Sequence, residues 1–277
     1  MTIRDILVHA DASRHLPARL AYALALAERS KARIAGLYVV GTPMVMASMG
    51  QPMTAEVYET LMDVAKEGAA RSKAMFEKAV SGAGGSVEWR EARDGVDEAV
   101  ALHGRYADLI IVGQPDPDEP TPPGGSSTVA ASAALNAGRP VLVVPYAGAF
   151  TPPPRHVVAA WDASRAATRA IHDALPLMAM AEKVTLLSVA PDAEDLGPLP
   201  GADMAAHLAR HGLDVTARTE QGADSSVADI LLNFISDEGA EMLVMGGYGH
   251  SRMRELVLGG ATRGILRSMT VPVLLGH

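Results

Sequence analysis

Glycines cluster near the end of the sequence, on both sides of a segment with the pattern of a helix. The segment Gly246-Gly-Tyr-Gly249 follows the apolar run EMLVM, and nine residues separate Gly249 from the pair Gly259 and Gly260. Because glycine has no Cβ, its backbone N–H group can approach an anion closely. A helix start adds unpaired N–H donors and the positive end of the helix dipole. The spacing therefore indicates either a phosphate-binding loop or a tight turn with a purely structural role.

Charged side chains accompany these glycines. Arg252 and Arg254 lie in the segment between them, and together with a protonated His250 they would offset the charge of a phosphate group. The carboxylate Asp162 directly follows another apolar run, HVVAAW. Ligands of open α/β sheets collect at the carboxyl ends of the strands, where the strand order reverses, so these residues are expected to meet there.

The elements that position these residues occur twice along the chain. Residues 4–40 and 155–190 both contain an apolar run, the sequence Asp-Ala-Ser-Arg, a helical pattern and a second apolar run, so that Asp11 matches Asp162. Further on, YADLIIVGQ matches GAEMLVMGG, and RPVLVVP matches TVPVLLG. The proline-rich stretch AGAFTPPPR lies between the two copies and indicates a linker. We therefore predict two domains, residues 1–147 and 154–277.

Each half alternates strand and helix patterns. In the first half, helices are predicted over 17–30, 55–80, 96–106 and 128–137. The runs DLIIVG and PVLVV are apolar without alternation, which indicates strands of a parallel sheet that are buried on both faces. Right-handed crossovers then place helices on both sides and predict a doubly wound α/β fold. In both halves, the Asp or Ser of Asp-Ala-Ser-Arg is expected to cap the next helix.

Composition narrows the class of protein. The chain has 277 residues, no cysteine, and a formal net charge of -8 from 24 basic and 32 acidic residues. Without a basic run, nucleic acid is not expected as a partner. Without about 20 uninterrupted apolar residues, no membrane partner is expected either. The start, MTIRDILVHAD, lacks the pattern of a signal peptide, so a soluble, cytoplasmic protein is expected.

Taken together, the motifs resemble the universal stress protein family. That family is similar in having a five-stranded unit, which opens on strand-Asp-x-Ser and closes on Gly-x-x-Gly-x9-Gly before a Val-Pro-Val strand. The similarity occurs once in each half and so covers nearly the whole chain. The resemblance implies two tandem flavodoxin-like (adenine nucleotide alpha hydrolase-like) domains, each a doubly wound, parallel, five-stranded sheet. It also implies an internal pseudo-dimer in which PVLVVP pairs with PVLLG, while a further homodimer stays open.

The resemblance also implies a ligand, ATP or AMP, in the second domain only, with Mg²⁺ possible alongside ATP. The residues carried over to a nucleotide site are Asp162, Val189, Met245, Gly246, Tyr248, Gly249, His250, Gly259 and Gly260. One position departs from the family pattern, because Gly260 stands where a Ser or Thr hydroxyl would contact a phosphate, and Thr262 follows two residues later. A hydrogen bond to a charged group contributes about 1.5–3 kcal/mol, so its loss would weaken binding roughly ten- to a hundredfold.

The first half departs further from the pattern. In VGQPDPDEPTPPGG, Gly113 remains at the strand end, Asp116 takes the place of the second glycine, and Asp118 and Glu119 follow. Three carboxylates repel an anion, and the prolines stiffen a different loop. We therefore predict that this half does not bind a triphosphate in the manner of the family.

Other functions remain open. The chain has no Gly-x-Ser-x-Gly elbow and no Gly-Lys-Ser/Thr of a P-loop, and no catalytic residue is assigned. No metal site is assigned either; His207 and His211 are interpreted as surface residues, with a metal-binding pair as the minor alternative. The alternatives to nucleotide binding are a member that acts through protein contacts or another small ligand, and a slow ATP hydrolase.

Overall fold

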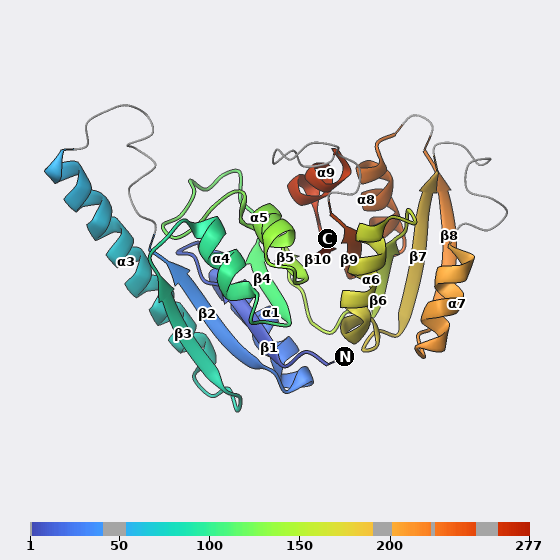
Figure 1. The fold of residues 1–277 in the computed structure, drawn as a ribbon, viewed down its shortest axis with the longest axis horizontal. Coiled ribbons are helices and arrows are strands. Elements are labelled where there is room, and N and C mark those ends of the chain that lie inside the picture. Colours follow the sequence, from blue (N-terminus) through green and yellow to red (C-terminus); the bar gives the residue numbers. More distant parts are fainter. Residues whose placement is uncertain (1, 41–53, 191–200, 223–224, 248–259) are drawn as a thin grey trace. The chain divides into compact units, whose positions relative to one another are not determined.

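The computed structural model describes residues 2–40, 54–190, 201–222, 225–247 and 260–277. The chain forms two compact units, one of residues Ile3–Gly138 and one of residues Arg139–His277 together with the first two residues (Figure 1). Each unit alternates strands and helices, as the sequence predicts.

The first unit contains a parallel sheet with the strand order β3-β2-β1-β4. Helices α1 and α3 pack together on one face of this sheet, and α4 and α5 pack together on the other (Figure 1). Its elements are β1 (Asp5–His9), α1 (Leu16–Ser30), β2 (Arg33–Val39), α3 (Ala55–Val80), β3 (Val87–Ala92), α4 (Val96–Gly104), β4 (Leu109–Gly113) and α5 (Val129–Asn136).

The second unit contains strands in the order β5-β10-β9-β6-β7-β8, all parallel except β5. Its elements are β5 (Val141–Val144), β6 (His156–Ala160), α6 (Arg165–Met178), β7 (Lys183–Ala190), α7 (Ala202–Arg210), β8 (Val215–Gln221), α8 (Val227–Asp237), β9 (Met242–Gly246), α9 (Gly260–Ser268) and β10 (Val273–Gly276). Strand β5 runs antiparallel to β10, with Val143 opposite Val273. The predicted pairing of PVLVVP with PVLLG is therefore confirmed.

The doubly wound α/β fold is also confirmed. When strands β6 to β10 are numbered 1 to 5 along the chain, their order in the sheet is 3-2-1-4-5. The direction of winding therefore reverses between β6 and β9. The central strands are buried on both faces, as their unbroken apolar runs predict; Ile110 and Ile111 of β4 are both fully buried. By contrast, the outer strand β8 carries exposed polar side chains. None of the helices in the described parts of the chain has both the length and the apolar character needed to cross a membrane.

The two copies of Asp-Ala-Ser-Arg start their helices differently. In the second unit, Ser164 is the N-cap of α6 and accepts a hydrogen bond from Ala167 N (3.1 Å), as predicted. In the first unit the prediction is wrong, because α1 begins at Leu16 with His15 as its N-cap and no capping side chain. Proline in the first turn suits this later start, and the hydroxyl of Ser13 accepts from His15 N (2.9 Å) instead.

The compact units divide between Gly138 and Arg139, upstream of the proline-rich linker. This division assigns β5 to the second unit, whereas the sequence repeat places the same strand at the end of the first half. The domain boundaries 1–147 and 154–277 therefore stay a prediction about the repeat.

Candidate functional site

Three strands of the second unit end side by side at the edge where the winding reverses. Ala160 of β6 lies opposite Leu187 of β7, and Ala159 lies opposite Val244 of β9. The predicted residues Asp162, Val189, Met245 and Gly246 lie at or just beyond these strand ends. This edge is where an open α/β sheet binds its ligand.

Asp162 presents its carboxylate at this edge. The residue is exposed, and its Oδ1 accepts a hydrogen bond from Ser164 N (2.9 Å), which turns the chain into α6. Trp161 N donates to Leu187 O (2.8 Å), so the segment after β6 continues alongside β7. Val189, near the end of β7, is half-buried, and Met245 of β9 is buried, so both strands bring apolar side chains to this edge of the sheet.

Gly246 has a structural explanation independent of any ligand. A Cβ at this position would lie 2.5 Å from Ala167 N and 2.6 Å from Ala166 C, both of which are backbone atoms of α6. Its register partner in β10 is Gly276, and a Cβ added there would lie 2.5 Å from Ala170 Cα. The close approach of α6 to β9 and β10 therefore requires glycine, whether or not a phosphate binds nearby.

The described part of helix α9 starts with Gly260, which is exposed. A Cβ added to Gly260 would meet no atom of the described residues within 4 Å. Thr262 is only 3% exposed, so its hydroxyl does not replace the side chain that Gly260 lacks. The remaining predicted residues, Tyr248, Gly249, His250 and Gly259, lie outside the described residues.

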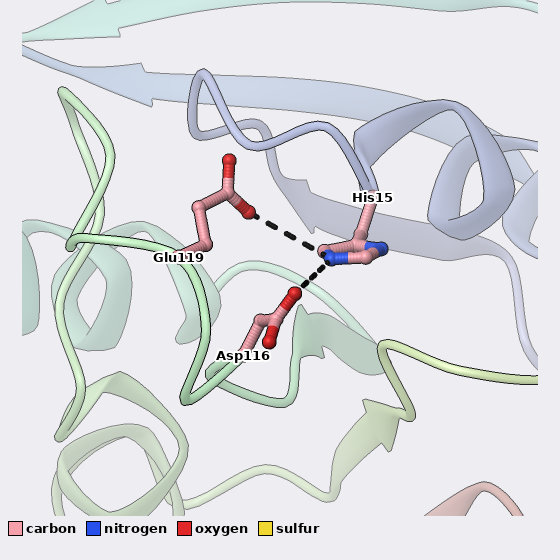
Figure 2. Close-up of side chains that lie close together, drawn as sticks. All are labelled: His15, Asp116 and Glu119. Carbon is pink, nitrogen blue, oxygen red and sulfur yellow. Dashed lines mark hydrogen bonds and ion pairs between the residues drawn. The ribbon is translucent and has the colours of Figure 1, made fainter.

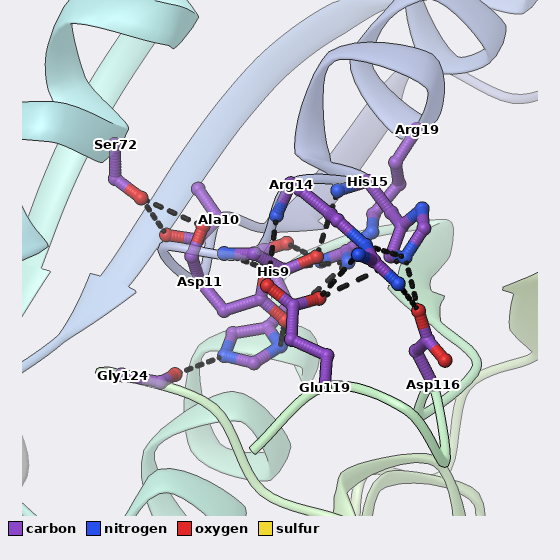
Figure 3. A network of polar contacts seen from close by, with 11 residues as sticks. His9, Ala10, Asp11, Arg14, His15, Arg19, Ser72, Asp116, Glu119 and Gly124 are labelled. Carbon is purple, nitrogen blue, oxygen red and sulfur yellow. Dashed lines mark hydrogen bonds and ion pairs between the residues drawn. The ribbon is translucent and has the colours of Figure 1, made fainter. Parts of the chain in front are cut away.

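In the first unit, the corresponding edge is filled by the chain's own side chains (Figure 3). The guanidinium of Arg19 is buried, donates to His9 O (2.6 Å) and lies 3.2 Å from the Asp11 carboxylate. It also occupies the space that a side chain at Gly113 would need. By the sequence repeat, the counterpart of Arg19 in the second unit is Ala170, whose methyl group cannot form the ion pair that Arg19 forms with Asp11.

The charges of this buried group are settled by its neighbours. Burial alone raises the pKa of Asp11, but Arg19, His9 and the hydrogen bond from Ser13 N together outweigh it and hold the pKa below its ordinary value. Burial also lowers the pKa of His9, whose Nε2–H donates to Gly124 O (2.7 Å). The first unit thus holds an ionised Asp11, paired with Arg19, next to a neutral imidazole.

A second group of polar side chains, His15, Asp116 and Glu119, lies close together at the same edge (Figure 2). His15 Nε2 is 2.8 Å from Asp116 Oδ2 and 3.7 Å from Glu119 Oε2. The guanidinium of Arg14 also donates to Asp116, and this hydrogen bond contributes most to lowering the pKa of Asp116 to about 2. Sequence reasoning missed this cluster because 101 residues separate His15 from Asp116.

Two cavities adjoin the first unit. One of about 260 Å³ is lined by Asp11, His15, Arg19, Asp116 and Glu119, at the carboxyl ends of the strands. A larger hollow of about 1020 Å³ lies at the opposite edge, against the first residues of β1, β2 and β3. The smaller cavity is the better candidate because the charged groups converge there.

The fold and the strand-end edge together define a tandem, doubly wound α/β protein. Residues 154–277, somewhat less than half of the chain, match the sequence model described as the universal stress protein family. A curated relative, universal stress protein Slr1230 of Synechocystis, is 39% identical over 46 residues, a segment that spans only 17% of this chain and 16% of the relative.

Solved structures extend the similarity of fold to almost the full length. A universal stress protein from Archaeoglobus fulgidus has 18% identity and a TM-score of 0.72, with 99% of this chain and 96% of that chain covered. A protein named as a putative universal stress protein from Pseudomonas aeruginosa has 17% identity and a TM-score of 0.59, with 99% and 93% covered. At these identities the similarity shows the fold alone.

Proposed function

We propose that this protein is a stress-response protein that senses or stores an adenine nucleotide, ATP or AMP, in its second unit. The main support is the contrast between two matching carboxylates. Asp162 is exposed at the strand-end edge, whereas Asp11 is buried and paired with Arg19. The second unit therefore offers an exposed carboxylate at this edge, and the first unit buries the matching carboxylate.

In this proposal, different residues bind different parts of the nucleotide. Asp162 accepts hydrogen bonds from ribose hydroxyls, and Val189 and Met245 contact the adenine ring. The phosphates are bound by backbone N–H groups at the glycine-rich segment and the start of α9, namely Gly246, Tyr248, Gly249, His250, Gly259 and Gly260. ATP would bring Mg²⁺ with it, and the site would work in the cytoplasm, where these nucleotides are available.

One observation favours a second candidate. Gly260 lacks a hydroxyl and Thr262 is buried, so the start of α9 is a weaker phosphate site than the family pattern provides. A member that binds another small ligand, or that acts through protein contacts, would tolerate this change. The net charge of -8 argues against nucleic acid as the partner in either case.

A pair of substitutions at Gly260 tests the proposal. Among the described residues the position has room for a side chain, so Gly260→Ser restores the hydroxyl and Gly260→Ala adds only the carbon. Calorimetric titration of the full chain with AMP and with ATP should show about ten- to a hundredfold tighter binding for the serine variant, and no comparable gain for alanine. If neither the parent nor the serine variant binds either nucleotide, the proposal fails and the second candidate takes its place.

A further inference from the structure

Three potential metal ligands converge from two loops of the first unit, where β1 and β4 end (Figure 2). His15, Asp116 and Glu119 each direct one ligand atom into a space in which these atoms all lie within 4.8 Å of one another. We propose that these residues bind a divalent transition-metal ion, with Zn²⁺ as the preferred ion. This site is separate from the proposed nucleotide site, which belongs to the other unit.

The donor set and its spacing both suit Zn²⁺. Imidazole nitrogen and carboxylate oxygen bind zinc at about 2.0–2.2 Å, so ligand atoms in a tetrahedral site lie about 3.4 Å apart. The separations from His15 Nε2 are 2.8 Å to Asp116 Oδ2 and 3.7 Å to Glu119 Oε2, which bracket that value. The third separation, between the carboxylate oxygens of Asp116 and Glu119, is at most 4.8 Å, so side-chain rotation can bring the three ligands around one ion, and two carboxylates neutralise its charge. Three protein ligands leave a fourth position for water.

The local backbone holds these side chains in place. Asp116 Oδ1 accepts a hydrogen bond from Asp118 N (2.9 Å), and Glu119 N donates to Asp116 O (3.2 Å). The Asp116 side chain is 3% exposed, while those of His15 and Glu119 are both 22% exposed. The adjoining cavity of about 260 Å³ gives a small ion access to this partly buried cluster.

A cation already lies beside these carboxylates. The guanidinium of Arg14 pairs with Asp116 and lies 3.8 Å from Glu119, but the Arg14 side chain is 60% exposed. Because the Arg14 side chain is largely exposed, a metal ion can displace its guanidinium into solvent, at the cost of the hydrogen bond to Asp116. Arg14 is therefore a competitor of the ion, and its removal should strengthen metal binding.

The test is a calorimetric titration of the full, chelator-treated chain with Zn²⁺ alone. All proteins carry His207→Ala, because the His207 ring lies 5.2 Å from that of His172 and 4.8 Å from that of His211, and this substitution keeps any zinc bound by these histidines out of the titration. In this background, Asp116→Asn should weaken Zn²⁺ binding more than about tenfold. Asp118→Asn, which changes the neighbouring carboxylate of the same loop, should leave it unchanged.

Arg14→Gln supplies a result that a purely structural cluster would not give, namely Zn²⁺ binding tighter than the parent by about fivefold or more. Circular dichroism checks that each variant is folded, and His15→Gln replaces Asp116→Asn if the latter is not. The proposal is overturned if the His207→Ala protein does not bind Zn²⁺, or if a folded ligand variant binds it as tightly as that protein does.

Discussion

At the scale of single residues, His9 is a neutral imidazole with charged side chains around it. It is fully buried, and Asp11, Arg19 and Asp97 all act on its ring. Its Nε2–H donates to Gly124 O, whereas Nδ1 has no hydrogen-bond partner among the described residues and lies 4.0 Å from Asp11 Oδ2. The cost of burying a charge exceeds the attraction of Asp11, so the pKa of His9 lies below its ordinary value of 6.5.

This lowered pKa predicts a loss of stability in mild acid. As the pH falls below about 6.5, the unfolded chain takes up a proton at His9 before the folded chain does. The stability contributed by the neutral ring is thus complete above that pH and is lost as the pH falls toward the folded pKa. Urea unfolding at about pH 7.5 and about pH 5.5 should show a smaller loss for His9→Gln than for the parent. Equal losses would contradict this account.

Single residues also show which parts of a site can be predicted from the sequence. The repeat correctly indicates that Asp11 and Asp162 are matching positions at strand ends. It does not indicate that Asp11 is buried, because this depends on Arg19, eight residues later, turning back into the sheet edge. The pairing of His15 with Asp116 is equally hidden, since it joins two loops that only the fold brings together.

At the scale of elements, the seam between α6 and the ends of β9 and β10 depends on small residues. A Cβ added to Gly246 would lie 2.5 Å from Ala167 N of α6, whereas a Cβ at Gly247 would meet its nearest atom among the described residues, Gly276 O, at 3.8 Å. The adjacent glycines therefore differ in what they tolerate. Gly247 N also donates to Gly276 O (2.8 Å), which continues the pairing of the two strands.

This difference predicts the outcome of two alanine substitutions. Gly246→Ala should lower the free energy of unfolding by about 1–3 kcal/mol, because the helix must move away from the strand. Gly247→Ala should stay within about 0.5 kcal/mol of the parent. Chemical denaturation of both variants measures the difference, and equal destabilisation would mean that close packing is not the reason for glycine at position 246.

Element positions were largely predictable because local patterns determine them. The helix predicted over 55–80 has those bounds as α3, with Thr54 as its N-cap. The start of α1 was predicted within one residue, but its cap was not, since Pro17 and the contacts of Arg14 and His15 with the 116–119 loop shape that turn. The pairing of β5 with β10 follows from the resemblance to the universal stress protein family and not from either strand alone.

At the scale of the whole molecule, the two copies of the repeat have diverged. Their units carry different side chains at the edge where the strands end. One unit fills its edge with Arg19, Asp11 and the loop that carries Asp116. The other keeps Asp162 exposed beside half-buried Val189. Duplication allows this, because one copy can lose a ligand site while the other retains it. We therefore expect one nucleotide site per chain.

A crystal structure of the full chain with saturating AMP tests this expectation most directly. The account predicts one nucleotide per chain, with the ribose at Asp162, the adenine against Val189 and the phosphate near Gly260 at the start of α9. It predicts no nucleotide at Asp11, where Arg19 occupies the space. An empty edge at Asp162, or a nucleotide bound at Asp11, would contradict the account.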